Sequence, residues 1–255
     1  MNLFRTSVLS RWGIPPIPKI KLGLQRIANE NIAAQCAVNA LKSGEYVNPH
    51  GDREPLGMVR VPIEQAALIA YLAKHCDTPL SVEAGLGMGM TASIILAARE
   101  LEGREFDHRI FDPCGLSNER GGLVRNLLVE QFGTKFRWIK KKSQCAMAEI
   151  ALADSAIRSS FLLVDGDHHF DGVLADFFMA DQILSEDGFI VIDDARFPAI
   201  ETLVQFIIHN RSDYEVSLLE IPNTAVLRKV STDQRSWEHF APFPVPQRKN
   251  WTAAD

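Results

Sequence analysis

The sequence predicts an α/β protein with a Rossmann-like, doubly wound and mostly parallel sheet, extended at both ends. From Leu80 onward, short apolar runs alternate with helical patterns, which is the order of βαβ units. The apolar runs are nearly continuous, as expected of strands buried on both faces. With 255 residues, 46% of them hydrophobic and 23% charged, the chain can bury a full core and fits one domain with extensions.

The first 60 residues are predicted to form a helical extension. Apolar residues recur at helical spacing between Lys21 and Lys42, and Gly44 offers a stop, so we expect one helix there. The next stretch, EYVNPHGDREPLG, is rich in Pro, Gly and charge and predicts a loop able to cover a site. Pro62 then opens a second helix that runs to about Lys74.

Residues 61–230 are predicted to form the main domain. We expect parallel strands at LSVEAG, HRIFD, FRWIKK, FLLVDGD and GFIVIDD, with helices between them. YEVSLLEI and TAVLRKV, separated by Pro222 and Asn223, predict a closing antiparallel hairpin. The tail, residues 231–255, contains APFPVPQ and is expected to be irregular.

The charge balance and the cysteine content limit the classes of partner and the cellular location expected for this protein. Lys and Arg number 27 against 32 Asp and Glu, and a net charge of -5 gives no broad attraction for nucleic acid or anionic lipid. The run Lys140 to Lys142 is interpreted as a solvated strand end. The four cysteines form no CxxC pair, and neither a signal peptide nor an apolar run of about 18 residues is present. We expect a cytoplasmic protein with a small-molecule partner and leave a homo-oligomer open.

The sharpest motif runs from Val82 to Thr91, VEAGLGMGMT, after a predicted strand and straight into a helix. Glycines at alternate positions allow a tight turn and close approach of a ligand, and the free N–H groups of a helix N-terminus attract an anion. A dinucleotide fingerprint would place its third glycine where Met90 stands, so NAD is the minority interpretation. A tight turn without a ligand is the alternative.

Acidic residues end two later strands. Asp165 follows one strand, Asp193 and Asp194 end the next, and His168 lies three residues after Asp165. Carboxyl ends of parallel strands share one sheet edge, where ligands bind. Three unpaired carboxylates would repel one another, so the cluster implies a cation, and oxygen ligands favour Mg²⁺. The alternatives are a capping or turn pair for the two adjacent acids and a surface imidazole for His168.

These motifs together resemble the class I S-adenosylmethionine-dependent methyltransferases. The acid-x-Gly-x-Gly-x-Gly order is similar to the first motif of that family. The segment FLLVDGDHHFDGVLADFFMADQILSEDGFIVIDDA resembles the metal-dependent O-methyltransferases of the catechol and macrolide-sugar types. The resemblance covers about Leu80 to Val230 in strand order, and it implies the same fold.

The resemblance also implies a site. The glycine loop would hold S-adenosylmethionine, with Glu83 toward its ammonium group and Asp112 at its ribose hydroxyls, although a strand-end acid such as Asp112 is often a turn residue. A divalent metal, Mg²⁺ first, would be held by Asp165, Asp193 and Asp194, although the catechol type has Asn at the last position. The implied catalytic residues are His168, as base, and Asp165. The implied cofactor-binding residues are Glu83, Gly85, Gly87, Gly89, Thr91, Asp112, Ser143 and Gln144.

Three functional hypotheses follow. The first is metal-dependent O-methylation of a small-molecule hydroxyl, in which the enzyme aligns the acceptor with the methyl group and removes the hydroxyl proton. The second is an NAD-linked oxidoreductase, and the third is an S-adenosylmethionine-binding protein without catalysis. The sequence does not identify the methyl acceptor.

Overall fold

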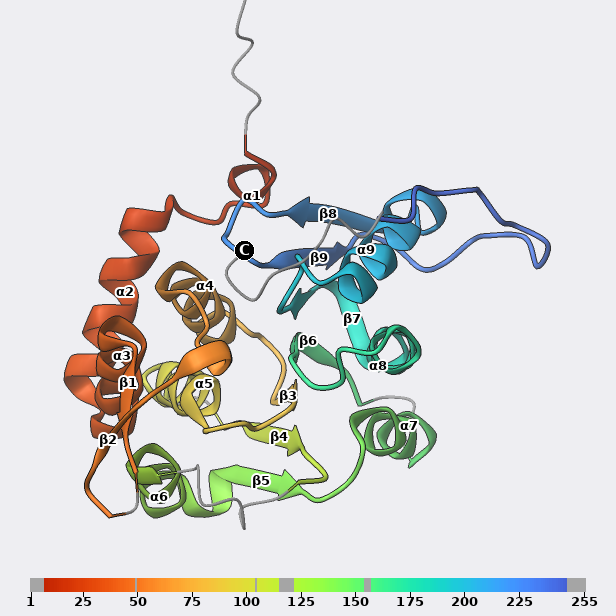
Figure 1. Ribbon diagram of the computed structural model, residues 1–255. Coiled ribbons are helices and arrows are strands. Elements are labelled where there is room, and N and C mark those ends of the chain that lie inside the picture. The colour runs from red at the N-terminus through yellow and green to blue at the C-terminus, as the bar shows by residue number, and fades with distance from the viewer. Residues whose placement is uncertain (1–6, 49, 104, 115–121, 154–156, 247–255) are drawn as a thin grey trace, which may run out of the picture.

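A seven-stranded sheet forms the centre of the computed structural model, which describes residues 7–48, 50–103, 105–114, 122–153 and 157–246 (Figure 1). The strand order is β5-β4-β3-β6-β7-β9-β8. Only the β7–β9 and β8–β9 pairs are antiparallel, which confirms the predicted sheet and its closing hairpin. The strands are β3 (Leu80–Ala84), β4 (Asp107–Phe111), β5 (Phe136–Ile139), β6 (Ser159–Val164), β7 (Leu184–Ile192), β8 (Tyr214–Leu218) and β9 (Ala225–Lys229).

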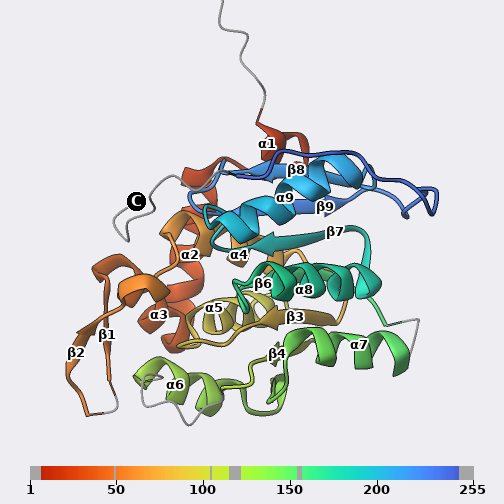
Figure 2. The ribbon, with the colours of Figure 1, turned by 45° about the vertical axis from the view of Figure 1, so that its right-hand side comes forward.

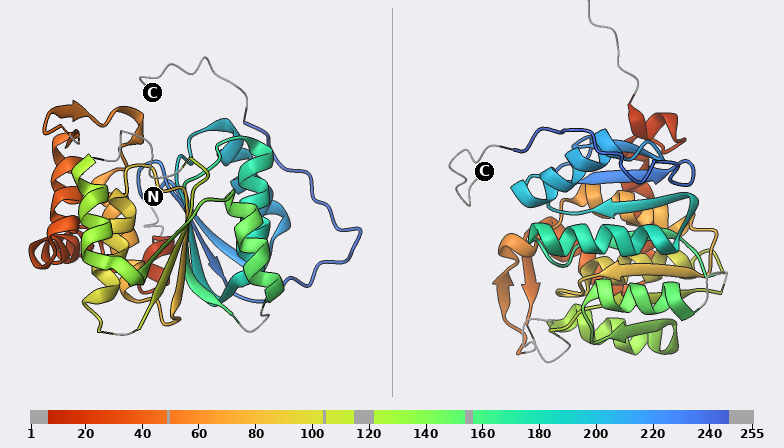
Figure 3. Two further views of the ribbon diagram at one scale, coloured as in Figure 1. Left: turned by 90° about the horizontal axis from the view of Figure 1, so that it is seen from below. Right: turned by 90° about the vertical axis from the view of Figure 1, so that its right-hand side faces the viewer.

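Helices cover both faces of the sheet (Figure 3). One face carries α4 (Ile63–Lys74), α5 (Met90–Glu100) and α6 (Gly122–Phe132), followed by the short η3 (Gly133–Lys135). The other face carries α7 (Ser143–Ala153), α8 (Phe170–Ile183) and α9 (Pro198–Asn210). Each face has its own apolar core, as a sheet buried on both sides requires. This arrangement leaves the carboxyl edge of the parallel strands for polar groups.

The N-terminal segment differs from the prediction, because two helices replace the single expected one. After the short α1 (Val8–Arg11), α2 (Ile17–Glu30) ends at Asn31, and α3 (Ile32–Ser43) begins there. Asn31 has extended backbone angles, and its side-chain oxygen accepts a hydrogen bond from the N–H of Ala34 at 3.1 Å. An asparagine that caps the following helix in this way interrupts a continuous helix, which apolar spacing alone does not reveal.

The predicted loop after α3 is also more ordered than expected. It contains a small antiparallel pair, β1 (Glu45–Val47) and β2 (Arg53–Pro55), and then the one-turn η1 (Gly57–Val59). The Tyr46 hydroxyl donates to Glu54 at 2.6 Å across this pair. The next helix, α4, follows Pro62 and ends at Lys74, as predicted.

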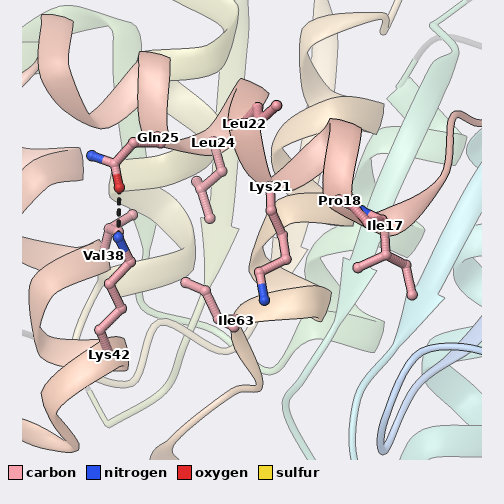
Figure 4. A pocket seen from close by; sticks show the side chains of 9 residues that line it. All are labelled: Ile17, Pro18, Lys21, Leu22, Leu24, Gln25, Val38, Lys42 and Ile63. Atoms are coloured by element: carbon pink, nitrogen blue, oxygen red, sulfur yellow. Dashed lines mark hydrogen bonds between the residues drawn. The ribbon is translucent and has the colours of Figure 1, made fainter.

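Helices α2 and α3 pack against α4 and α5 as an outer layer (Figure 2). Their apolar side chains belong to the same core as those of α4 and α5. An apolar groove lies between α2, α3 and α4, and Lys42 donates to Gln25 at 2.5 Å beside it (Figure 4). The domain boundaries at residues 60 and 230 stay predictions.

The described part of the tail, residues 231–246, contains no helix or strand. It packs back onto α9, where the Asn210 side chain donates to the carbonyl of Ala241 at 2.9 Å and accepts from its N–H at 2.7 Å. Within the described residues, none of the helices has the length and apolar character needed to cross a bilayer.

Candidate functional site

The glycine loop joins β3 to α5, and each of its glycines is required or favoured for a different structural reason. Gly85 has a φ of +92°, and a Cβ there would lie 1.9 Å from the carbonyl oxygen of Asp165 on the neighbouring strand, so no larger residue fits. Gly87 has a φ of +49°, and a Cβ there would have no protein atom within 4 Å. The backbone at Gly87 therefore faces open space. Gly89 follows and forms the N-cap of α5.

Glu83 and Thr91 connect the strand to the helix. Glu83 is completely buried, and the Thr91 hydroxyl donates to its Oε1. Its Oε2 lies 3.0 Å from Nε2 of His108 on β4. The carboxylate thus ties together β3, β4 and α5, a role that the sequence analysis did not foresee. Its contact with a cofactor's ammonium group stays a prediction.

Asp112 directly follows β4 and lies beside the glycine loop. Its Oδ2 accepts from the N–H groups of Leu86 at 2.9 Å and Gly87 at 3.4 Å, and its Oδ1 accepts from Cys114 N–H at 2.8 Å. The ribose contact stays a prediction.

Arg125, on α6, holds the other side of the same loop. This largely buried side chain donates to the carbonyl of Gly87 at 2.7 Å. Burial lowers the pKa of its guanidinium, while the charge of Asp112 opposes that effect. The sequence analysis missed Arg125, although a single arginine within the apolar helix GLVRNLLVEQF was the available signal.

Ser143 and Gln144 begin α7. Ser143 is buried, and its hydroxyl donates to Oδ1 of Asp176 on α8 at 2.5 Å. Burial raises the pKa of Asp176 to about 6, and the other carboxylate oxygen has no hydrogen-bond partner among the described residues. Gln144 is half-buried. The adenine contacts of Ser143 and Gln144 stay predictions.

The acidic cluster and the glycine loop face one cavity of about 190 Å³. The short segment after β2 contributes a wall through Val59 and Val61. The tertiary structure therefore brings the two motifs of the sequence to a common space at the carboxyl edge of the sheet. The remaining lining residues are Leu86, Gly87, Met88, Met90, Thr91, Asp165, His168, Asp193 and Asp194.

The acidic cluster brings three carboxyl groups close to one imidazole. His168 Nε2 lies 3.4 Å from Oδ2 of Asp194 and 3.7 Å from Oδ1 of Asp165. Burial raises the pKa of Asp165, although His168 opposes the shift. Burial and then the charges of Asp165 and Asp194 raise the pKa of Asp193 to about 8. The interaction with Asp165, followed by the charge of Asp194, raises the pKa of the His168 imidazole.

Asn223, in the turn between β8 and β9, orients Asp194. Its Nδ2 donates to Oδ1 of Asp194 at 2.6 Å, and the N–H of Asp194 donates to Oδ1 of Asp193 at 2.7 Å. Asp194 has a φ of +54°, an uncommon conformation for a residue other than glycine, and such strain concentrates at functional sites. The sequence analysis treated Asn223 only as a turn residue.

The donor chemistry of this cluster suits a hard cation, because its carboxyl groups face one cavity and hard cations prefer oxygen ligands. As the side chains are arranged, no three or more His, Cys, Asp or Glu residues in the described ranges form a group that could hold an ion. The fit is therefore one of donor type and location.

Comparison with known proteins agrees with this geometry. Residues 82–195, which include the glycine loop, Asp112 and the acidic cluster, match a family model described as a methyltransferase domain. This match confirms the resemblance to class I methyltransferases predicted from the sequence. No curated protein matches the sequence.

Solved structures share the fold at low sequence identity. The methyltransferase PaMTH1 from Podospora anserina, solved with bound SAH, is 13% identical over 67% of this chain and 80% of that chain, with a TM-score of 0.51. CalS11, a TDP-rhamnose 3'-O-methyltransferase of calicheamicin biosynthesis, is 12% identical over 83% and 93%, with a TM-score of 0.53. A protein from Corynebacterium glutamicum is 15% identical over 80% and 91%, also with a TM-score of 0.53.

Proposed function

We propose that the protein transfers a methyl group from S-adenosylmethionine to a hydroxyl oxygen of a small molecule, with a divalent metal ion at the acidic cluster. One observation carries this proposal. The open backbone at Gly87 and the acid–imidazole cluster face the same cavity, inside a segment that matches a methyltransferase domain. Cofactor and acceptor can therefore meet at one place. O-methylation is also the activity after which CalS11, a TDP-rhamnose 3'-O-methyltransferase, is described.

The glycine loop supplies the cofactor side of the proposed site. Gly87 leaves room for S-adenosylmethionine, and Asp112 lies next to the loop, where its carboxylate would accept hydrogen bonds from the ribose hydroxyls. Asp112 and Arg125 already hold the loop from two sides, through its N–H groups and its carbonyl. A loop held in this way loses little further conformational entropy when a ligand binds.

The cavity wall supplies the chemistry. The acceptor oxygen attacks the methyl carbon in line, so that a C–O bond forms while the C–S bond breaks and its electron pair stays on sulfur. Orientation of the two reactants can contribute on the order of 7 to 11 kcal/mol. His168 takes the hydroxyl proton, and Asp165 and Asp194, at 3.7 and 3.4 Å, stabilise the imidazolium that forms. A cation held by Asp165, Asp193 and Asp194 would lower the pKa of the acceptor hydroxyl.

Calorimetry with S-adenosylmethionine tests the cofactor assignment. Gly87→Val should weaken binding at least about tenfold, because the side chain enters the space that the cofactor needs. Gly103→Val is the matched control, since Gly103 also has a positive φ and open surroundings but lies outside the cavity. Equal binding by Gly87→Val and the unaltered protein would contradict the assignment, and NAD binding would favour the oxidoreductase hypothesis.

Turnover with labelled S-adenosylmethionine and a panel of hydroxylated acceptors tests the metal and the base. EDTA should abolish transfer and Mg²⁺ should restore it. His168→Ala should lower kcat by roughly 10²- to 10⁴-fold and leave cofactor affinity unchanged, since the proton moves only during the reaction. Full activity in EDTA would exclude the metal while leaving methyl transfer intact.

A further inference from the structure

A second cavity, which we call the outer cavity, lies where α2 packs on α4 and on the end of α5 (Figure 1). Its volume is about 240 Å³, somewhat below the roughly 300 to 1,000 Å³ that is typical of drug-sized ligand sites. The buried side chains of Ile20, Leu24 and Ile27, all on α2, give it an apolar wall. An enclosure of this size and lining suits a small molecule with an apolar body.

The side chains around the outer cavity that can carry charge near neutral pH are all basic. They are Lys19, Arg26, Lys74 and His75, and none of the described residues that line it is an aspartate or a glutamate. Lys74 lies 3.3 Å from Glu102, and both Lys74 and His75 are at the end of α4, where a helix favours positive charge. The presence of these two therefore has a structural explanation.

Lys19 and Arg26 have no such explanation. Neither has a hydrogen bond or an ion pair with another of the described residues. Together with Gly23 they follow one another at spacings of four and three residues, so all three share one face of α2. Lys19 also lies in the first turn of α2, where the helix dipole disfavours a cation and no acidic residue offsets it. The rim of the outer cavity therefore has positive charge that an anion would compensate.

Gly23 leaves the wall of the outer cavity open between these two cations. Glycine in the interior of a helix is less favourable than alanine, because the unfolded chain gains conformational freedom from it. A Cβ at Gly23 would meet no protein atom within 4 Å, so the packing of α2 does not require a glycine there. What the glycine provides is access to the apolar wall between Lys19 and Arg26.

The neighbouring groove between α2, α3 and α4 shows the contrasting case (Figure 4). It also has two lysines, but Lys21 lies 2.8 Å from Glu64 and Lys42 donates to Gln25 at 2.5 Å. The cations of the groove therefore have partners within the chain, whereas Lys19 and Arg26 at the outer cavity do not.

We propose that the outer cavity is a second ligand site, for a small monoanion with an apolar body such as an arylalkyl carboxylate. The carboxylate accepts charge-assisted hydrogen bonds from Lys19 and Arg26, while the aryl group lies on the apolar wall. The proposal goes beyond methyl transfer and does not rest on it. The site shares no residue with the cavity at the glycine loop, because α4 and α5, of 12 and 11 residues, separate the two by about 16 to 18 Å.

Calorimetry with hydrocinnamate and with hydrocinnamamide, its neutral match, tests the site without cofactor or methyl acceptor. The carboxylate should bind about tenfold more tightly than the amide, because only the carboxylate pairs with the two cations. Replacing both cations, by Lys19→Met and Arg26→Met, should remove this preference. Lys42→Met, in the neighbouring groove, is the control and should keep it. Equal affinities for the two probes in the unaltered protein, or an unchanged preference in the double variant, would overturn the proposal.

Gly23→Leu locates the bound probe. The leucine side chain enters the outer cavity, so affinity for hydrocinnamate should fall at least about tenfold. The variant should unfold at the same temperature as the unaltered protein or higher, since leucine is a better helix former than glycine. Undiminished binding of hydrocinnamate by the folded variant would mean that the probe binds elsewhere, and the proposal would fail. Because neither probe reports on methyl transfer, the result is independent of the outcome for S-adenosylmethionine.

Discussion

Two clusters of acidic residues in this protein differ in how their charge is compensated. In the first, Arg211 lies 2.8 Å from Asp181 and 2.7 Å from Asp213, and Lys229 lies 2.9 Å from Asp181. Tyr214 also donates to Asp181 at 2.7 Å. Burial alone would raise the pKa of Asp181, but the hydrogen bonds from Lys229, Arg211 and Tyr214 outweigh it and lower the pKa.

The second cluster lines the cavity, and there the balance is reversed. This cluster consists of Asp165, Asp193 and Asp194, and the imidazole of His168 lies 3.7 Å from Asp165 and 3.4 Å from Asp194. The pKa values of Asp165 and Asp193 are raised, because burial is not offset by enough positive charge. The charges of the first cluster are compensated within the chain, whereas the raised pKa values of the second cluster are typical of a functional site.

The largest expected effect comes from breaking the compensated cluster. Arg211→Met should lower the free energy of unfolding by about 3 to 5 kcal/mol, because two buried carboxylates lose their main partner. Urea denaturation measures this change. The exposed Arg158→Met serves as a control and should stay within about 0.5 kcal/mol. A loss below about 1 kcal/mol for Arg211→Met would show that the pairing contributes little.

Neutralising one acid in each cluster should change the free energy of unfolding in opposite directions. In EDTA at neutral pH, Asp193→Asn should raise the free energy of unfolding by about 2 to 3 kcal/mol, because the folded protein no longer disfavours a charge at that position. Asp213→Asn should lower it instead, because Arg211 loses a charged partner. Chemical denaturation of both variants checks the pair, and equal signs would remove the distinction between the clusters.

Asp176 is a buried acid outside both clusters, and the pH dependence of stability tests whether burial raises its pKa. Burial raises its pKa from 3.8 to about 6, so the folded protein holds this proton more tightly than the unfolded chain does. The resulting stabilisation is complete below about pH 3.8 and is lost as the pH rises through about 6. Between about pH 3.8 and about pH 6, the free energy of unfolding of the unaltered protein should fall by about 2 kcal/mol relative to that of Asp176→Asn. Parallel stability curves for the two proteins would contradict this assignment.

The smallest effect is expected at an exposed ion pair. Lys141 lies 2.7 Å from Glu149, and their side chains are 48% and 61% exposed. Lys141→Met should change the free energy of unfolding by less than about 1 kcal/mol, because water and salt screen the pair. Thermal unfolding of both proteins at low and high salt measures this change in the free energy of unfolding. A larger change would mean that exposure does not predict ion-pair strength in this protein.

The sheet and the two motifs could be predicted from the sequence, because the signals for them are local. Apolar runs define β3 to β7, Pro222 and Asn223 mark the closing turn, and alternate glycines mark the loop before α5. Strand-end acids could be assigned to a common edge because parallel strands all direct their carboxyl ends the same way.

The side chains that support this edge could be identified only from the packing of the folded chain. Arg125 lies on α6 and Asn223 lies in the turn between β8 and β9, and nothing in the sequence indicates that they contact Gly87 and Asp194. Glu83 was predicted from the glycine motif to face the cofactor. In the structure its carboxylate is bound by Thr91 and His108. Periodicity reveals which face of an element is buried, but hydrogen-bond partners depend on distances between segments that only packing sets.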